Sequence, residues 1–160
     1  MNVLFYGSAI IAILATLMVI TRTNVVHALL YFIVSLLSIA VIFYTLGAPF
    51  AAALEVIVYA GAIMVMFLFV VMMLNLGQVT QDQERAWLTP SIWIGPSLMA
   101  IPLLIEVIYA INMTDAEMAT TVVSGKDVGT ALFGPYVLAV ELASMLLLAG
   151  LVGAFHLARK

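Results

Sequence analysis

Apolar residues run along this chain in five long stretches, and short polar segments separate them. A hydrocarbon layer of about 30 Å requires about 20 consecutive apolar residues at a rise of about 1.5 Å per residue. In lipid such stretches must be helices, because an open strand edge would leave backbone groups unpaired. The sequence therefore predicts an all-α polytopic membrane protein, with one integral membrane domain over residues 1–160 and five transmembrane helices. These spans are expected at residues 3–21, 27–46, 50–76, 91–111 and 135–158.

The composition excludes most classes of water-soluble protein. Of the 160 residues, 66% are apolar and 8% are charged, and the mean hydropathy is +1.28. An ordinary soluble domain has about 25% charged residues, so a soluble enzyme, a nucleic-acid binder and a disordered regulator are excluded. The formal net charge of −3 offers no basic surface to nucleic acid. Cysteine is absent, which excludes disulfides, thiolate-held iron–sulfur clusters and a cysteine nucleophile.

Basic residues are divided unevenly between the two predicted membrane faces. One face carries Arg22, Arg85, Arg159 and Lys160, and the other carries Lys126. By the positive-inside rule, the N-terminus is expected outside and the C-terminus in the cytoplasm. The first stretch lacks the basic start and the cleavage site of a signal peptide, so it is expected to be retained.

Three glutamates lie within the predicted spans, at about 7 to 9 Å from the outer boundary by the rise per residue. They are Glu55, Glu106 and Glu141. A carboxylate inside a membrane is by default a candidate for ion or proton handling. Glu55 and Glu141 are the favoured candidates, because their helices continue apolar on both sides. For Glu106, a hydrogen bond within the bundle or contact with outer headgroups is an equally good interpretation.

The third stretch combines a carboxylate, a phenol and a glycine. Glu55 and Tyr59 are four residues apart and therefore share a helix face, so they are candidates for a proton relay. Gly61 falls near mid-membrane, where a missing side chain permits close helix contact or a local change of winding. On the residues alone, packing is the simpler interpretation of Gly61. In the fourth stretch, Pro102 predicts a kink.

Two histidines raise the question of a haem. His27 and His156 lie near the inner ends of their predicted helices, where two axial ligands would be conceivable. Single histidines beside arginines are explained more simply as anchors at the membrane interface. The sequence predicts no metal site and no cofactor bound by this chain.

Three segments resemble one known family. Residues 53–67 (ALEVIVYAGAIMVMF) resemble the third helix of the subunit J family of proton-pumping NADH:quinone oxidoreductase, respiratory complex I. Residues 23–31 (TNVVHALLY) resemble the start of that family's second helix, and residues 132–150 (LFGPYVLAVELASMLLLAG) resemble its last helix. The mitochondrial counterpart is NADH dehydrogenase chain 6. Departures from the family are the end at Lys160, the weakly matching loop after residue 112, and Glu106.

The resemblance implies a hetero-oligomeric setting in the bacterial inner membrane. The chain is expected to pack beside the membrane subunits A, H and K, of which the second contains the quinone site. Flavin, iron–sulfur clusters and quinone are expected in or between other subunits. This chain would supply no catalytic centre, and would help to couple quinone reduction to proton translocation.

The resemblance also changes the interpretation of Gly61. In the family, the third helix can hold a π-bulge near the positions of Tyr59 and Gly61, and its change to regular helix accompanies formation of a water path. This implies that Gly61 is a hinge and that residues 59–67, ending at Phe67, change winding. Glu55 and Glu141 match positions in bacterial relatives. Two alternatives to a coupling role stay open: a small subunit of a multi-subunit cation/proton antiporter, and a passive assembly scaffold.

Overall fold

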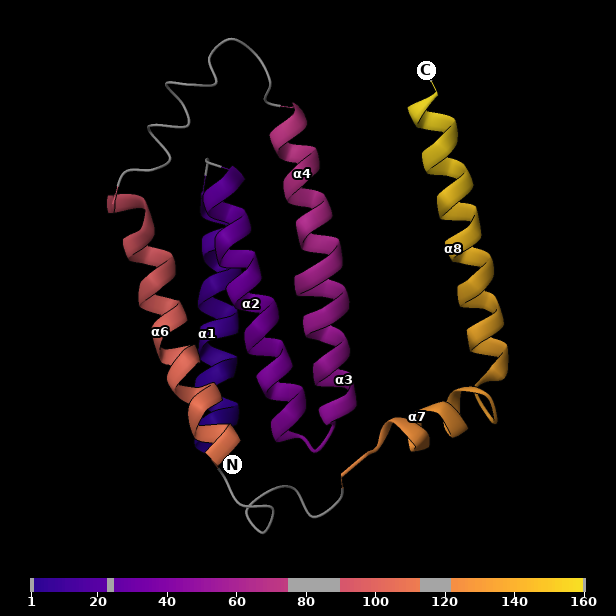
Figure 1. The fold of residues 1–160 in the computed structure, drawn as a ribbon, viewed down its shortest axis with the longest axis horizontal. Coiled ribbons are helices and arrows are strands. Elements are labelled where there is room, and N and C mark those ends of the chain that lie inside the picture. Colours follow the sequence, from indigo (N-terminus) through magenta and orange to yellow (C-terminus); the bar gives the residue numbers. More distant parts are fainter. Residues whose placement is uncertain (1, 23–24, 75–89, 113–121, 160) are drawn as a thin grey trace. The chain divides into compact units, whose positions relative to one another are not determined.

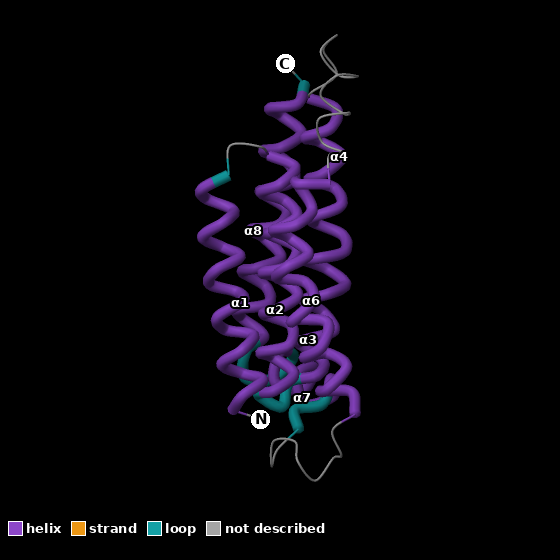
Figure 2. Tube along the Cα trace, turned by 90° about the vertical axis from the view of Figure 1, so that its left-hand side faces the viewer, coloured by secondary structure: helices purple, strands orange, loops and turns teal. Residues whose placement is uncertain are grey.

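The computed structural model describes residues 2–22, 25–74, 90–112 and 122–159. Within these ranges every regular element is a helix (Figure 2). Five helical stretches are long and apolar enough to cross a membrane, which confirms the predicted number of spans. The orientation in the membrane remains a prediction. The chain divides into two compact units, Met1–Val122 and Val123–Lys160.

The first unit contains four of the spans, which run up and down beside one another (Figure 1). Its third span is built from three consecutive helical segments. The elements are α1 (Asn2–Thr21), α2 (Val25–Thr45), α3 (Pro49–Leu54), η1 (Glu55–Ile63), α4 (Met64–Leu74) and α6 (Pro90–Asn112).

Helix α2 is the centre of the first unit, because it contacts α1, α3, η1, α4 and α6. Small and hydroxyl-bearing residues allow these helices to approach closely, which is typical of packing in lipid. Ala15, Ser8 and Ser38 are completely buried. The outward surfaces stay apolar and exposed, as expected where the surroundings are lipid or other membrane subunits.

The turn from α2 into α3 reverses the chain within three residues. Gly47 has a φ of 79°, a conformation that glycine adopts without the steric cost of a Cβ atom. Its N–H donates to the carbonyl oxygen of Tyr44, and the N–H of Ala48 donates to that of Phe43, both at 3.0 Å. This is the Schellman arrangement that ends a helix. Pro49 then starts α3, where a missing N–H costs nothing.

Helix α6 continues through two internal prolines, Pro96 and Pro102. Of these, only Pro102 was predicted to affect the helix. Each proline removes one backbone donor. A kink at Pro102 remains a prediction.

The second unit begins in the region between residues 112 and 134, which was predicted to be a loop. It contains α7 (Gly125–Leu132), followed by α8 (Val137–Ala158). A capping box starts α7: Asp127 N–H donates to Ser124 Oγ, and Ser124 N–H donates to the Asp127 carboxylate. These hydrogen bonds with Ser124 lower the pKa of Asp127, its hydroxyl contributing most. The loop prediction was therefore wrong over this short helix.

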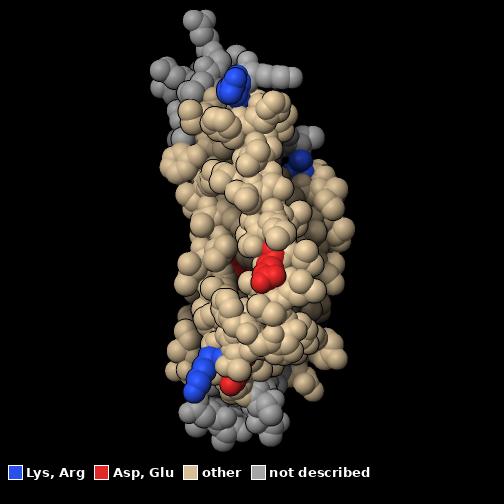
Figure 3. Space-filling view, turned by 90° about the vertical axis from the view of Figure 1, so that its right-hand side faces the viewer, with Lys and Arg blue, Asp and Glu red and all other residues tan. Residues whose placement is uncertain are grey.

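Charged side chains are sparse on the face drawn in Figure 3, and most of that surface is uncharged. Several residues named in the sequence-based predictions lie outside the described ranges. They are Thr23, Asn24, Arg85 and Lys160.

Candidate functional site

The third span changes its winding in the middle. Segment η1 is a π-helix of nine residues between the α-helical segments α3 and α4. At its start the N–H of Glu55 donates to the carbonyl oxygen of Ala51, four residues back. At its end the N–H of Met64 donates to that of Tyr59, five residues back. Winding of this kind is rare and is found frequently at functional sites.

Gly61 lies inside η1 at a point where the backbone is crowded. A Cβ atom added to Gly61 would lie 3.2 Å from the carbonyl oxygen of Val56. This distance is tighter than an ordinary van der Waals contact, so a larger residue would press on the carbonyl group. The missing side chain therefore suits the wider winding observed here.

Glu55 and Tyr59 both belong to η1. Tyr59 is 52% exposed, and Glu55 is partly exposed. Among the residues that the structure describes, no hydrogen bond joins the Glu55 carboxylate to the Tyr59 hydroxyl. The Tyr59 side chain is therefore available to a group outside this unit.

One side of this span is fixed to α2. Met64 directly follows η1 and is 2% exposed, and it packs in a cluster with Leu29 and Leu36 of α2. Ala60 of η1 packs against the same cluster. By contrast, Ile57 and Ile63 are at least half exposed. Segment η1 is thus held along α2 and uncovered elsewhere.

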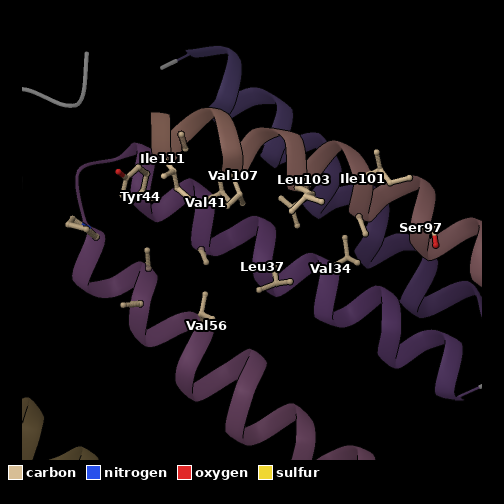
Figure 4. A pocket seen from close by; sticks show the side chains of 17 residues that line it. Val34, Leu37, Val41, Tyr44, Val56, Ser97, Ile101, Leu103, Val107 and Ile111 are labelled. Carbon is tan, nitrogen blue, oxygen red and sulfur yellow. The ribbon is translucent and has the colours of Figure 1, made fainter. Parts of the chain in front are cut away.

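An apolar groove of about 850 Å³ lies between α2, the α3–η1 segment and α6. Figure 4 shows Val56 of η1 facing it, opposite residues of α6 such as Ile101 and Val107. Tyr44 and Ser97 are the polar residues in its lining. The groove provides open space beside the π-helical segment.

The remaining predicted residues lie in other elements. Phe67 is in α4, beyond the π-helical segment, and is 51% exposed. Glu141 is in α8 of the second unit; its side chain is exposed, and its carbonyl oxygen accepts a hydrogen bond of 2.7 Å from the Ser144 hydroxyl. In the first unit, Glu106 of α6 accepts a hydrogen bond from Ser8 of α1. This confirms the interpretation of Glu106 as hydrogen-bonded within the bundle.

The described parts of the chain contain no group of three or more histidine, aspartate or glutamate residues placed to hold a metal ion. His27 lies in α2 and His156 in the last turn of α8. The site is therefore built from backbone winding, one carboxylate and one phenol.

Sequence comparison identifies relatives along the whole chain. Residues 15–157 match the family described as NADH-ubiquinone/plastoquinone oxidoreductase chain 6. NADH-quinone oxidoreductase subunit J of Pseudomonas aeruginosa is 60% identical, over 100% of this chain and 98% of the relative. Subunit J of Escherichia coli strain K12 is 62% identical, over 100% and 88%. That of Buchnera aphidicola subsp. Schizaphis graminum is 49% identical, over 100% and 99%.

These matches confirm the resemblance found in three segments of the sequence and extend it over the complete length. The chain belongs to the subunit J (chain 6) family, whose members are subunits of NADH-quinone oxidoreductase.

Proposed function

We propose that this chain helps to couple quinone reduction to proton translocation in the membrane arm of NADH-quinone oxidoreductase, through a change in the winding of η1. The observation that carries the proposal is the π-helical stretch Glu55–Ile63, inside an otherwise apolar span. Both proton-relay candidates of the first unit, Glu55 and Tyr59, lie on that stretch.

A change from π to α winding would move side chains without breaking the span. Each residue added to or removed from the helical register rotates the following part of a helix by about 100°. Rewinding η1 would therefore turn the exposed Tyr59 side chain relative to α3 or α4. Because Met64 is fixed on α2, the rotation would be concentrated in η1. The groove beside Val56 supplies space for displaced side chains.

The rotation would make or break a polar connection. An intramembrane carboxylate needs a partner or water, and the Tyr59 hydroxyl is exposed to whatever surrounds the unit. We propose that neighbouring subunits complete this connection when η1 has one winding and interrupt it when η1 has the other. Glu141 of α8 is proposed as a second proton-carrying carboxylate.

The surroundings proposed for the chain follow from the family. It is a multi-span subunit of a hetero-oligomer in the bacterial inner membrane, with its N-terminus outside and its C-terminus in the cytoplasm. Its neighbours are proposed to be the membrane subunits A, H and K, with flavin, iron–sulfur clusters and quinone in or between other subunits. The full-length similarity to NADH-quinone oxidoreductase subunits favours this assignment over the cation/proton antiporter.

The test compares substitutions at two neighbouring positions of η1. Gly61→Leu presses on the Val56 carbonyl oxygen, whereas Ala62→Leu extends a side chain that is already exposed. In membrane vesicles containing the assembled complex, Gly61→Leu is expected to lower proton pumping driven by NADH oxidation, and Ala62→Leu to leave it near the wild-type rate. Equal pumping by both variants would contradict the role of η1. A passive scaffold would tolerate both changes, provided that the complex stays intact.

A further inference from the structure

Glu106 is held between two residues of α1. The Ser8 hydroxyl donates a hydrogen bond of 2.6 Å to Glu106 Oε2, and Ser8 is completely buried. The other carboxylate oxygen, Oε1, lies against Gly7, where an added Cβ atom would clash with it. The carboxylate thus occupies the space that a side chain at position 7 would fill.

Further polar contacts hold the same three helices at other depths. Nearer the opposite end of α6, the Tyr31 hydroxyl of α2 lies against Gly95, and a Cβ atom there would clash with it. Between α1 and α2, the hydroxyl oxygens of Thr16 and Ser35 are 2.9 Å apart. Helix α6 is therefore joined to α1 near its C-terminal end and to α2 near its N-terminal end.

The environment of Glu106 differs from that of Glu55. The polar partners along the α1–α2–α6 contact, Ser8 and Ser35, are at most 2% exposed. Neither Ser8 nor Glu106 belongs to the lining of the apolar groove. A closely packed contact without open space favours fixed helices over a route for water or protons.

We propose that Glu106 is a positioning residue that fastens α6 to α1, with Gly7 as its seat and Ser8 as its donor, and that it carries no protons during turnover. The α1–α2–α6 group then forms a rigid frame beside η1. This inference stands apart from the proposed winding change, because it would hold even if η1 kept one winding throughout.

The fastening role makes Gly7 and Glu106 interdependent. Adding a methyl group at Gly7 displaces the carboxylate, and overpacking of this kind is destabilising. Shortening Glu106 to alanine removes the atoms that the methyl group would meet. The effects of the two substitutions should therefore be non-additive, as for residues in direct contact.

The experiment measures heat inactivation of NADH:quinone reductase activity in the purified intact complex. Gly7→Ala is expected to accelerate inactivation by about tenfold, a factor equivalent to about 1.4 kcal/mol. In a Glu106→Ala background, adding Gly7→Ala should change the rate by less than about twofold, within the error expected for additivity. The matched control is Gly129→Ala, because a Cβ atom on Gly129 has no described atom within 4 Å. Its inactivation rate should stay at the wild-type value.

Two results would overturn the fastening role. One is a wild-type inactivation rate for Gly7→Ala, and the other is the same acceleration in both backgrounds. If Gly7→Ala alone prevents assembly, the proposal requires that the double variant Gly7→Ala/Glu106→Ala assembles; failure of both would contradict it.

A conservative variant separates fastening from proton transfer. Glu106→Gln keeps an oxygen that accepts from Ser8 but cannot exchange a proton as a carboxyl group does. It should retain both the wild-type inactivation rate and the wild-type number of protons pumped per NADH, whereas Glu106→Leu should inactivate faster. Loss of pumping in Glu106→Gln at normal heat stability would identify Glu106 as a proton carrier and overturn the proposal.

Discussion

The position of a Cβ atom on Gly61 is 3.2 Å from the carbonyl oxygen of Val56, five residues earlier in the same helix. Five residues is the spacing at which a π-helix closes its hydrogen bonds, whereas an α-helix closes them at four. A side chain at residue 61 therefore opposes the observed winding more than it would oppose a regular α-helix.

Gly61→Ala is expected to bias the segment toward α winding. Because only one methyl group is added, the effect on pumping should be smaller than that of Gly61→Leu. The measurement is the rate of proton pumping at equal NADH oxidation in vesicles. A larger loss for alanine than for leucine would argue against steric control of the winding.

Glu55→Gln is expected to reduce proton transfer more than Glu106→Gln. The side chain of Glu55 lies on the π-helical segment, while Glu106 is packed between Gly7 and Ser8. Both substitutions remove one carboxyl group and preserve the side-chain shape, so each serves as the other's control. Proton pumping per NADH in the assembled complex measures the difference. Equal losses, or a larger loss for Glu106→Gln, would reverse this assignment.

Gly95→Ala is expected to loosen α6 from α2. A methyl group at Gly95 would clash with the Tyr31 hydroxyl, and Tyr31 is only 4% exposed. The purified complex should lose activity faster on heating, and Tyr31→Phe in the same chain should restore part of the stability by removing the oxygen. Heat inactivation of the single and double variants tests this. No rescue by Tyr31→Phe would mean that the clash lies elsewhere.

The start of α7 is expected to respond to acid. The Ser124 hydroxyl and backbone N–H donate to the Asp127 carboxylate at 2.7 and 3.0 Å, and these bonds lower the pKa of Asp127 in the folded chain. The capping box therefore stabilises α7 above the ordinary aspartate pKa of about 3.9, and that contribution is lost as the pH falls through the lower folded value.

Hydrogen exchange of residues 125–128 in the complex, corrected for intrinsic rates, measures this response. In the wild type, protection should fall on acidification. In Asp127→Asn it should be weaker at neutral pH and nearly independent of pH, whereas Lys126→Gln should behave as the wild type. A pH response that survives in Asp127→Asn would assign it to another group.

The membrane architecture was predictable because hydropathy alone determines where a chain can cross lipid. The first predicted span, residues 3–21, differs from α1 (Asn2–Thr21) by one residue at its start. Helix α7 was missed because it is short and polar, although serine followed three residues later by aspartate is a capping signal in the sequence.

The candidate site was only partly predictable. Residues 55–63 are apolar enough for either winding, so composition does not distinguish a π-helix from an α-helix; Gly61 was the one local signal. The contact between Ser8 and Glu106 depends on how α1 and α6 are aligned along each other. That alignment arises from packing between segments 98 residues apart, which no local pattern records.

The most direct test is the structure of the intact complex at rest and during turnover, resolved well enough to trace backbone hydrogen bonds between residues 55 and 64. The account predicts that the Met64 N–H donates to Tyr59 in one state and to Ala60 in the other, while the α1–α2–α6 contacts stay the same. An identical π-helix in both states would contradict it.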